Sequence, residues 1–168
     1  MTDDFFIQTY EKYRNNIYSV ILNYVRNDAD AVELQQEVFM KFYSYKKDFE
    51  TDEHLKAWLI RVAINLCKNH LRDNKRITPT ELDENIPAPE NEDFSDILVI
   101  VLDLPEKYRI PIHLFYYEEY SIKQISEALG ILEATVKTRL NRGKNMIKKI
   151  LEKKGEDYGY KKRISKSS

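Results

Sequence analysis

Residues 121–144 read SIKQISEALGILEATVKTRLNRGK, a pattern that predicts two helices separated by a tight turn. The Ser121 hydroxyl and the Gln124 amide form a capping box, which satisfies two backbone N–H groups at the start of the first helix. Gly130 ends that helix, because a residue without a side chain adopts the left-handed backbone conformation at little cost. The apolar face of the first helix consists of Ile122, Ile125 and Leu129.

The second helix of the pair is basic. Its inward-pointing residues are expected to be Val136, Leu140 and Ile147. The polar side chains left available to solvent or to a ligand are Thr135, Lys137, Thr138, Arg139, Asn141, Arg142 and Lys144. A short capped helix, a glycine turn and a longer basic helix predict a helix-turn-helix, which binds DNA through its second helix. A plain helical hairpin would explain the spacing and the glycine, but would not call for so basic a second helix.

The charge of the chain is unevenly distributed, although the net charge is only −1. Residues 121–168 hold 13 basic and 5 acidic residues, which is typical of nucleic-acid binding but also of a solvated basic helix and tail. Residues 77–94 hold six acids, three prolines and no basic residue, so we expect a flexible acidic linker there. The chain is therefore expected to form two small helical domains, at residues 1–76 and 95–155, with a basic tail at 156–168.

Composition excludes several classes of protein. Four glycines among 168 residues are too few for the turns of a small β-sandwich or for a glycine-rich phosphate loop, so the expected fold class is all-α. One cysteine forms no internal disulfide, and the acidic start at residues 1–4 is unlike a signal peptide. The longest apolar run, residues 97–102, is far shorter than the ~18 residues of a membrane span. We expect a cytoplasmic protein without direct membrane insertion.

Residues 1–76 predict three helices. The first spans residues 5–25. The second runs from Ala31 to about Tyr45, with Asp28 and Asp30 as candidate N-caps.

The third helix begins near Glu53 and separates its side chains into two faces. The apolar face is expected to pack inside the domain and consists of Leu55, Leu59, Val62 and Leu66. The polar face consists of Arg61, Asn65, Lys68 and Arg72, with Asn69 beside it. A polar stripe is usually a solvated face, but amides and cations without an acid suit phosphates and base edges. Cys67 and His70 lie three residues apart without a second pair of ligands nearby, so no metal site is expected.

Residues 95–120 predict two further helices. Ser95 is a candidate cap for a helix that ends near Leu102, and Pro105 suits the first turn of the next helix. Pro111 costs ~3 kcal/mol in a helix interior, so the second of these helices is expected to bend there or to begin later. His113 is expected to be a satisfied residue on the helix face rather than a ligand.

Together these segments resemble the extracytoplasmic-function (ECF) group of bacterial sigma factors, the subunits that direct RNA polymerase to promoters. Residues 30–39, DAVELQQEVF, are similar to the family's polymerase-binding helix, with Glu33 in the place of its usual Asp. Residues 57–65, AWLIRVAIN, are similar to its promoter-melting segment. In the second half, the resemblance is carried by LPEKYR at 104–109, YSIKQIS at 120–126 and TVKTRLNRGK at 135–144. The motifs occur in the family's order and cover nearly the whole chain.

The sequence departs from the family pattern at the start of the basic helix. Leu132 stands where Ser or Pro is usual, and Ala134 stands where Gly is usual. The helix cap is expected to be weaker by ~1 kcal/mol than with Ser, while Glu133 complements the helix dipole. DNA binding is expected to be retained.

The resemblance implies a recognition protein without a catalytic residue or a cofactor, since the polymerase itself makes the phosphodiester bonds. It implies that the bacterial RNA polymerase core is bound by Glu33, Leu34, Gln36 and Glu37. The minus-10 element of promoter DNA would be opened and read by the loop at 46–53 and by Arg61, Asn65, Lys68, Asn69 and Arg72, with Trp58 mainly a core residue. The minus-35 element would be bound by Thr135, Lys137, Thr138, Arg139, Asn141 and Arg142. An anti-sigma factor is implied as a further partner.

Two other functions fit parts of the sequence. A helix-turn-helix transcription regulator that acts without core polymerase would use the basic helix, but it would give no role to the helix that carries Gln36 and Glu37. A small metal-dependent hydrolase or nuclease would need Glu33, Glu37 and His54 around one ion. No nucleophile, glycine cradle or close histidine pair accompanies those side chains.

Overall fold

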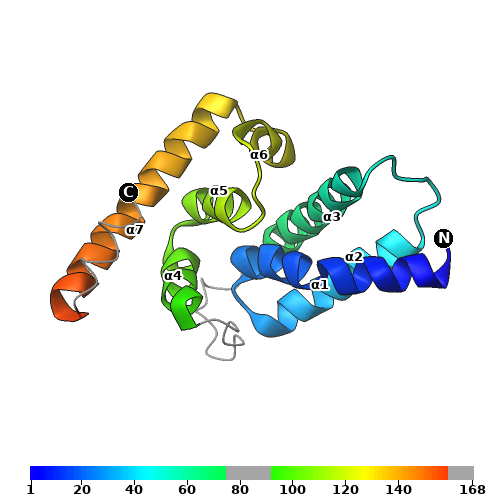
Figure 1. Ribbon diagram of the computed structural model, residues 1–168, viewed down its shortest axis with the longest axis horizontal. Coiled ribbons are helices and arrows are strands. Elements are labelled where there is room, and N and C mark those ends of the chain that lie inside the picture. Colours follow the sequence, from blue (N-terminus) through cyan, green and yellow to red (C-terminus); the bar gives the residue numbers. More distant parts are fainter. Residues whose placement is uncertain (75–91, 159–168) are drawn as a thin grey trace. The chain divides into compact units, whose positions relative to one another are not determined.

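The computed structural model describes residues 1–74 and 92–158, and every regular element in these two ranges is an α-helix. This confirms the predicted all-α fold class. The chain divides into two compact units, of which unit 1 contains α1–α3 and unit 2 contains α4, α5, α7 and most of α6 (Figure 1). The expected linker and tail fall largely on residues 75–91 and 159–168, which lie outside the described residues.

Unit 1 consists of α1 (Asp3–Val25), α2 (Asp28–Tyr43) and α3 (Asp52–Asp73), and α1 packs against both of the other helices (Figure 1). Each helix begins with a side-chain cap, in which an oxygen accepts a hydrogen bond from a backbone N–H three residues later. The capping residues are Thr2, Asn27 and Thr51. A cap of this kind contributes ~1 kcal/mol to helix stability.

The start of α2 differs from its prediction. Asn27 has an extended backbone and accepts from the Asp30 N–H at 2.9 Å, so it is the N-cap. The assignment of Asp28 or Asp30 to that role was wrong, because both residues lie inside the first helical turn. Asp28 instead accepts a hydrogen bond from the Tyr18 hydroxyl at 2.5 Å, which links α2 to α1.

The core of unit 1 is formed by one face of each helix. The α1 face includes Ile17, Val20 and Ile21, and Phe42 fills the centre from α2. Buried residues of α3 are Leu55, Leu59, Ile60, Ala63, Ile64 and Cys67. The predicted apolar stripe of α3 was correct at its first two members but wrong at Val62 and Leu66, which are only half-buried. The reason is that α3 contacts two helices and buries a broader face than a single stripe.

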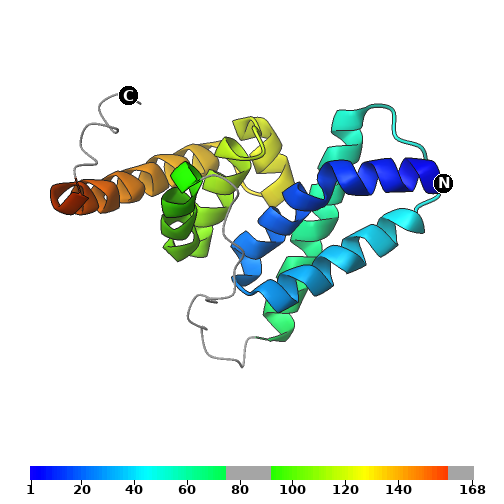
Figure 2. The ribbon, with the colours of Figure 1, turned by 60° about the horizontal axis from the view of Figure 1, so that its bottom comes forward.

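Unit 2 contains α4 (Glu92–Asp103), α5 (Glu106–Tyr116), most of α6 (Ile122–Leu129) and α7 (Glu133–Tyr158), with α5 packed against both α4 and α7. Figure 2 shows the length of α7, coloured orange to red. The predicted helix start at Ser95 was wrong, because α4 begins at Glu92, and α7 extends to Tyr158, within the segment expected as the tail. Pro111 is buried within α5, so the expectation that this helix begins later was also wrong.

The turn between α6 and α7 follows its sequence signals closely. Ser121 Oγ accepts from the Gln124 N–H at 3.1 Å, and Gln124 Oε1 accepts from the Ser121 N–H at 2.8 Å, which confirms the capping box. Gly130 has φ +67°, the left-handed conformation expected of it. Ser126 donates its hydroxyl proton to the Ile131 carbonyl at 2.5 Å, a bond that ties the two sides of the turn together.

His113 lies in the core of unit 2 with 1% of its surface exposed. Its ring stacks on Tyr117 at 5.0 Å, and its Nε2 lies 3.6 Å from the Glu118 carboxylate, which is also buried. His113 therefore lies deeper than the helix-face position expected of it.

Candidate nucleic-acid and protein interfaces

One face of α2 carries exposed polar side chains. Glu33, Gln36 and Glu37 are all exposed and lie one helical turn apart. Leu34 is 6% exposed and belongs to the core of unit 1, so the structure does not place it on this face. Gln35 turns the other way and donates to the Arg14 carbonyl of α1 at 2.5 Å. The exposed face therefore includes three of the four residues predicted to bind polymerase and excludes Leu34.

The same face continues beyond Glu37 to Met40, whose side chain is 69% exposed. Sequence reasoning missed this residue. The available signal was helical spacing. Met40 lies three residues after Glu37 and four residues after Gln36, so it shares their face of α2. A shallow surface depression begins here, lined by Glu37, Met40, Lys41, Ser44, Tyr45 and Trp58.

An aromatic cluster forms the far side of this depression. Trp58 lies 4.6 Å from Tyr45 and 5.6 Å from Phe49, measured between ring centroids, and it also contacts Phe42 in the core. Trp58 is half-buried, so it packs on the core with one side and lines the surface with the other. The residues that follow α2 are thereby anchored to α3.

The polar face of α3 is exposed along its length. Arg61, Asn65, Lys68, Asn69 and Arg72 are all exposed, and four of them recur at the spacing of one helical face. Arg72 Nε lies 3.4 Å from the carboxylate of its neighbour Asp73, and both groups are exposed. This face can offer amides and positive charges to an anionic strand.

The start of α3 is tied to α1 by a carboxylate. Asp52 Oδ2 accepts hydrogen bonds from Lys12 Nζ at 2.7 Å and from the Tyr13 hydroxyl at 2.6 Å. These two bonds hold the pKa of Asp52 below its usual value. Burial, together with the bond to Asp52, raises the pKa of Tyr13 to about 12. No sequence signal pointed to this contact, because its partners are about 40 residues apart.

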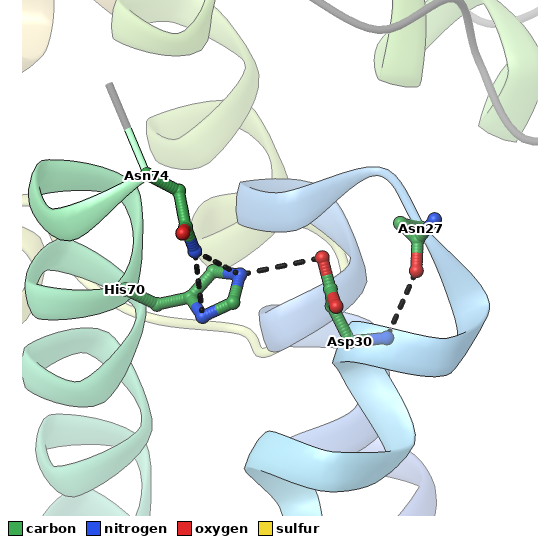
Figure 3. A network of polar contacts seen from close by, with 4 residues as sticks. All are labelled: Asn27, Asp30, His70 and Asn74. Atoms are coloured by element: carbon green, nitrogen blue, oxygen red, sulfur yellow. Dashed lines mark hydrogen bonds and ion pairs between the residues drawn. The ribbon is translucent and has the colours of Figure 1, made fainter. Parts of the chain in front are cut away.

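A second polar network joins the ends of α2 and α3 (Figure 3). His70 Nε2 lies 3.3 Å from the Asp30 carboxylate, and the Asn74 side chain lies 3.2 Å from the same nitrogen. Cys67 is buried. In the two described ranges, no three His, Cys, Asp or Glu side chains gather in a metal-binding arrangement. His70 thus has a structural role between two helices.

The predicted residues of α7 fall on two sides of the helix. Thr135, Thr138, Arg139 and Arg142 line one open pocket, together with Ala134 and with Lys107 and Tyr108 of α5. Lys137 and Asn141 are exposed but lie outside that pocket. Val136 and Gly143 are buried, Gly143 against Ile112 of α5, and Leu140 is half-buried. The residues of α5 in this pocket were missed by sequence reasoning.

Both units match models of known protein families. A family model described as sigma-70 region 2 matches residues 9–77, and one described as sigma-70 region 4 matches residues 95–147. The chain is 31% identical over 167 residues to the ECF RNA polymerase sigma factor SigW of Bacillus subtilis, covering 88% of this chain and 89% of that protein. The chain belongs to the ECF sigma factors.

Other relatives of this sigma factor agree with that assignment. It is 30% identical over 160 residues to the ECF RNA polymerase sigma-E factor of Haemophilus influenzae, with 84% of each chain covered. A solved structure of the sigma factor RpoE with the anti-sigma factor NepR, from Bartonella quintana, matches with a TM-score of 0.75. That match covers 90% of this chain and 98% of the other at 20% identity, and it supports the fold. Among the described helices, none has the length and apolar character to cross a membrane.

Proposed function

We propose that this sigma factor binds the bacterial RNA polymerase core through unit 1 and directs transcription initiation from promoters that both units read. The observation that carries the proposal is the pairing of two surfaces in one ECF chain. Unit 1 presents the exposed face of Glu33, Gln36 and Glu37, and unit 2 presents the cationic side of α7. The first surface suits a partner helix, and the second suits a DNA duplex.

The roles within unit 1 follow from exposure. The α2 face, extended by Met40, is proposed to dock on the polymerase core. The polar face of α3 is proposed to hold the opened minus-10 strand, with Arg61, Asn65, Lys68, Asn69 and Arg72 as contacts. Strand opening costs a few kcal/mol per unstacked base, which cations and stacking side chains offset. Leu34 is assigned to the core that supports the α2 face.

The roles within unit 2 follow from the helix-turn-helix. The first half of α7 is proposed to enter the major groove at the minus-35 element, with Thr135, Lys137, Thr138, Arg139, Asn141 and Arg142 as contacts. The domains are proposed to span residues 1–76 and 95–155, joined by the acidic segment at 77–94. A tethered pair of reading domains increases overall affinity without any new contact.

The test is run-off transcription by core bacterial RNA polymerase on fragmented DNA of the source organism. Specific transcripts should appear with the unaltered chain and vanish when Gln36 and Glu37 are both replaced by Ala. The matched control replaces Gln8 and Glu11, an exposed amide and an exposed carboxylate on α1, by Ala. Equal loss in both double variants would contradict the assignment of the α2 face to polymerase binding. DNA binding without any core-dependent transcript would favour a regulator that acts without polymerase.

This sigma factor is proposed to have no catalytic residue of its own and to work in the cytoplasm, where transcription takes place. Cleavage of DNA by the purified chain with a divalent metal would contradict the first statement. Cell fractionation that finds the chain away from the polymerase pool would contradict the second.

An anti-sigma factor is proposed as a regulatory partner, supported by the solved complex of a similarly folded sigma factor. The exposed α2 face is its proposed target. Such a partner should compete with core polymerase for this sigma factor, and simultaneous binding of both would contradict the proposal.

A further inference from the structure

An open pocket on unit 2 joins the start of α5 to the basic helix α7. Lys107 and Tyr108 line it from α5, and the α7 side consists of Ala134, Thr135, Thr138, Arg139 and Arg142. The lining therefore holds three cationic side chains and no carboxylate. Cationic side chains that converge without a carboxylate suit an anionic ligand such as a phosphate.

Tyr108 lines the pocket beside these cations. Lys107 Nζ lies 5.0 Å from the centre of the Tyr108 ring. Burial acts to raise the pKa of Tyr108, but hydrogen bonds and positive charge from Lys107 and Arg142 lower it below its usual value. Cations that line one pocket repel each other, and a bound anion would relieve that repulsion. The phenol proton stays available for donation to such an anion.

Close packing between α5 and α7 fixes the position of Tyr108. A Cβ atom on Gly143 would lie 3.3 Å from Tyr108 Cβ and 3.0 Å from Ile112 Cγ1. Gly143 thus allows the two helices to approach each other closely. The pocket is built on the rigid contact between two helices, which favours a defined binding geometry.

The pocket lies beside the part of α7 that faces away from the core. With 3.6 residues per turn, Val136 and Gly143 share one side of α7, which is buried in the core. Thr138 and Asn141 lie on the opposite side, which is exposed. The two arginines of the pocket, Arg139 and Arg142, flank this outward side. When a helix lies in the major groove, its outward side meets base edges and its flanks meet the phosphates of the groove walls.

We propose that Lys107 and Tyr108, together with Arg139 and Arg142, hold one backbone phosphate of the promoter duplex beside α7. This assignment rests on the proposed function of unit 2. Thr138 donates its hydroxyl proton to the Ala134 carbonyl at 3.0 Å, so it shapes the pocket without donating to the phosphate. The contact carries no base information and should act alike on every sequence.

The test measures how duplex binding depends on salt. The full chain is titrated into fluorescein-labelled 20-base-pair duplexes of several unrelated sequences, at salt concentrations from about 50 to 200 mM. Lys107→Gln should reduce the slope of log Kd against log salt by about 0.9, because one phosphate contact is lost. The ratio of the Kd values at the two salt limits should fall by roughly 3.5-fold, equally for every duplex.

Three matched variants accompany Lys107→Gln. Lys107→Arg keeps the charge and should restore the slope. Tyr108→Phe keeps the packed ring, and it should raise Kd by about two- to tenfold with little change in slope, since no charge is removed. Lys153→Gln removes an exposed lysine of α7 about 16 Å along the helix from Arg142, and it should leave the slope unchanged.

Four other outcomes would overturn the proposal. An unchanged slope in Lys107→Gln excludes the phosphate contact, and an equal change in Lys153→Gln means that only diffuse charge was measured. A loss confined to one duplex sequence indicates base reading. Weaker binding to core polymerase with intact duplex binding indicates an acidic protein segment as the occupant. If duplex binding follows the prediction but run-off transcription shows no dependence on core, the proposed function fails while the pocket assignment stands.

Discussion

Replacing Tyr13 with Phe removes one hydroxyl from unit 1 while the ring stays in the core, where Tyr13 is 5% exposed. The hydroxyl donates to Asp52, the first residue of α3, and so links α1 to the end of the loop proposed to meet the opened strand. The same carboxylate oxygen accepts from Lys12, which is 58% exposed. The two donors therefore differ in environment while sharing one acceptor.

The expected magnitudes follow from that difference. A hydrogen bond to a charged group contributes about 1.5–3 kcal/mol, and the lower end applies here because Asp52 is half-exposed and regains water. Tyr13→Phe should therefore cost about 1.5 kcal/mol. An ion pair between exposed side chains is screened by water and contributes little, so Lys12→Met should cost less than Tyr13→Phe.

The assay is native-state hydrogen exchange at the backbone amides of α1 and α3, which reports the free energy of opening within unit 1. A loss of about 1.5 kcal/mol corresponds to an opening constant about tenfold larger. The control is Tyr43→Phe, because Tyr43 is exposed and its hydroxyl lies 3.4 Å from its acceptor Asp3. Its effect should be under about 0.5 kcal/mol.

Two results would refute the reasoning. One is a larger effect for Lys12→Met than for Tyr13→Phe. The other is an unchanged cost of Tyr13→Phe when Asp52 is already Asn, since the two residues would then not be coupled.

The pH dependence of the same contact has a defined sign. The pKa of Asp52 is lowered in the folded state. Its contribution to the free energy of unfolding is therefore complete above about pH 4 and is lost as the pH falls through the folded pKa. The pKa of Tyr13 is raised to about 12 by burial and by Asp52. Its contribution is therefore complete below about pH 10 and is lost as the pH rises toward 12.

Three further predictions concern helix ends and packing. Asn27→Ala should destabilise the start of α2 by about 1 kcal/mol, seen as faster amide exchange there and not in unit 2. Leu132→Ser should stabilise α7 by about 0.5–1 kcal/mol, because Leu132 precedes the helix, is 76% exposed and offers no capping oxygen. Slower amide exchange at the start of α7 would verify this prediction, and faster exchange would contradict it. Gly143→Val should destabilise unit 2 by about 1–3 kcal/mol, because the new side chain meets Ile112. Amide exchange in α5 should therefore become faster. Unchanged exchange would show that α5 and α7 can move apart without cost.

The parts of the fold that sequence predicted well depend on local chemistry. Ser121, Gln124 and Gly130 act within a few residues of themselves, so their pattern was sufficient to place α6 and its turn. The exposed polar face of α3 was likewise predicted, because helical spacing alone determines which of its side chains share a face.

The parts that sequence predicted poorly depend on partners far along the chain. The breadth of the buried face of α3 reflects contact with two helices, so Val62 and Leu66 were misplaced. Leu34 belongs to a motif that the resemblance assigned to polymerase binding, yet packing buries it. Lys107 entered no predicted site, because only the approach of α5 to α7 brings it to Arg142.

The placement of Trp58 has a practical consequence for experiments on this sigma factor. It is the single tryptophan among 168 residues, and it belongs to unit 1. Intrinsic indole fluorescence therefore reports the folding of unit 1 without interference from unit 2. Because the half-buried ring also lines the depression beside Glu37, its emission is sensitive to water being displaced there. Single-stranded DNA, which contains no indole, can thus be tested for binding at this surface without attaching an extrinsic dye.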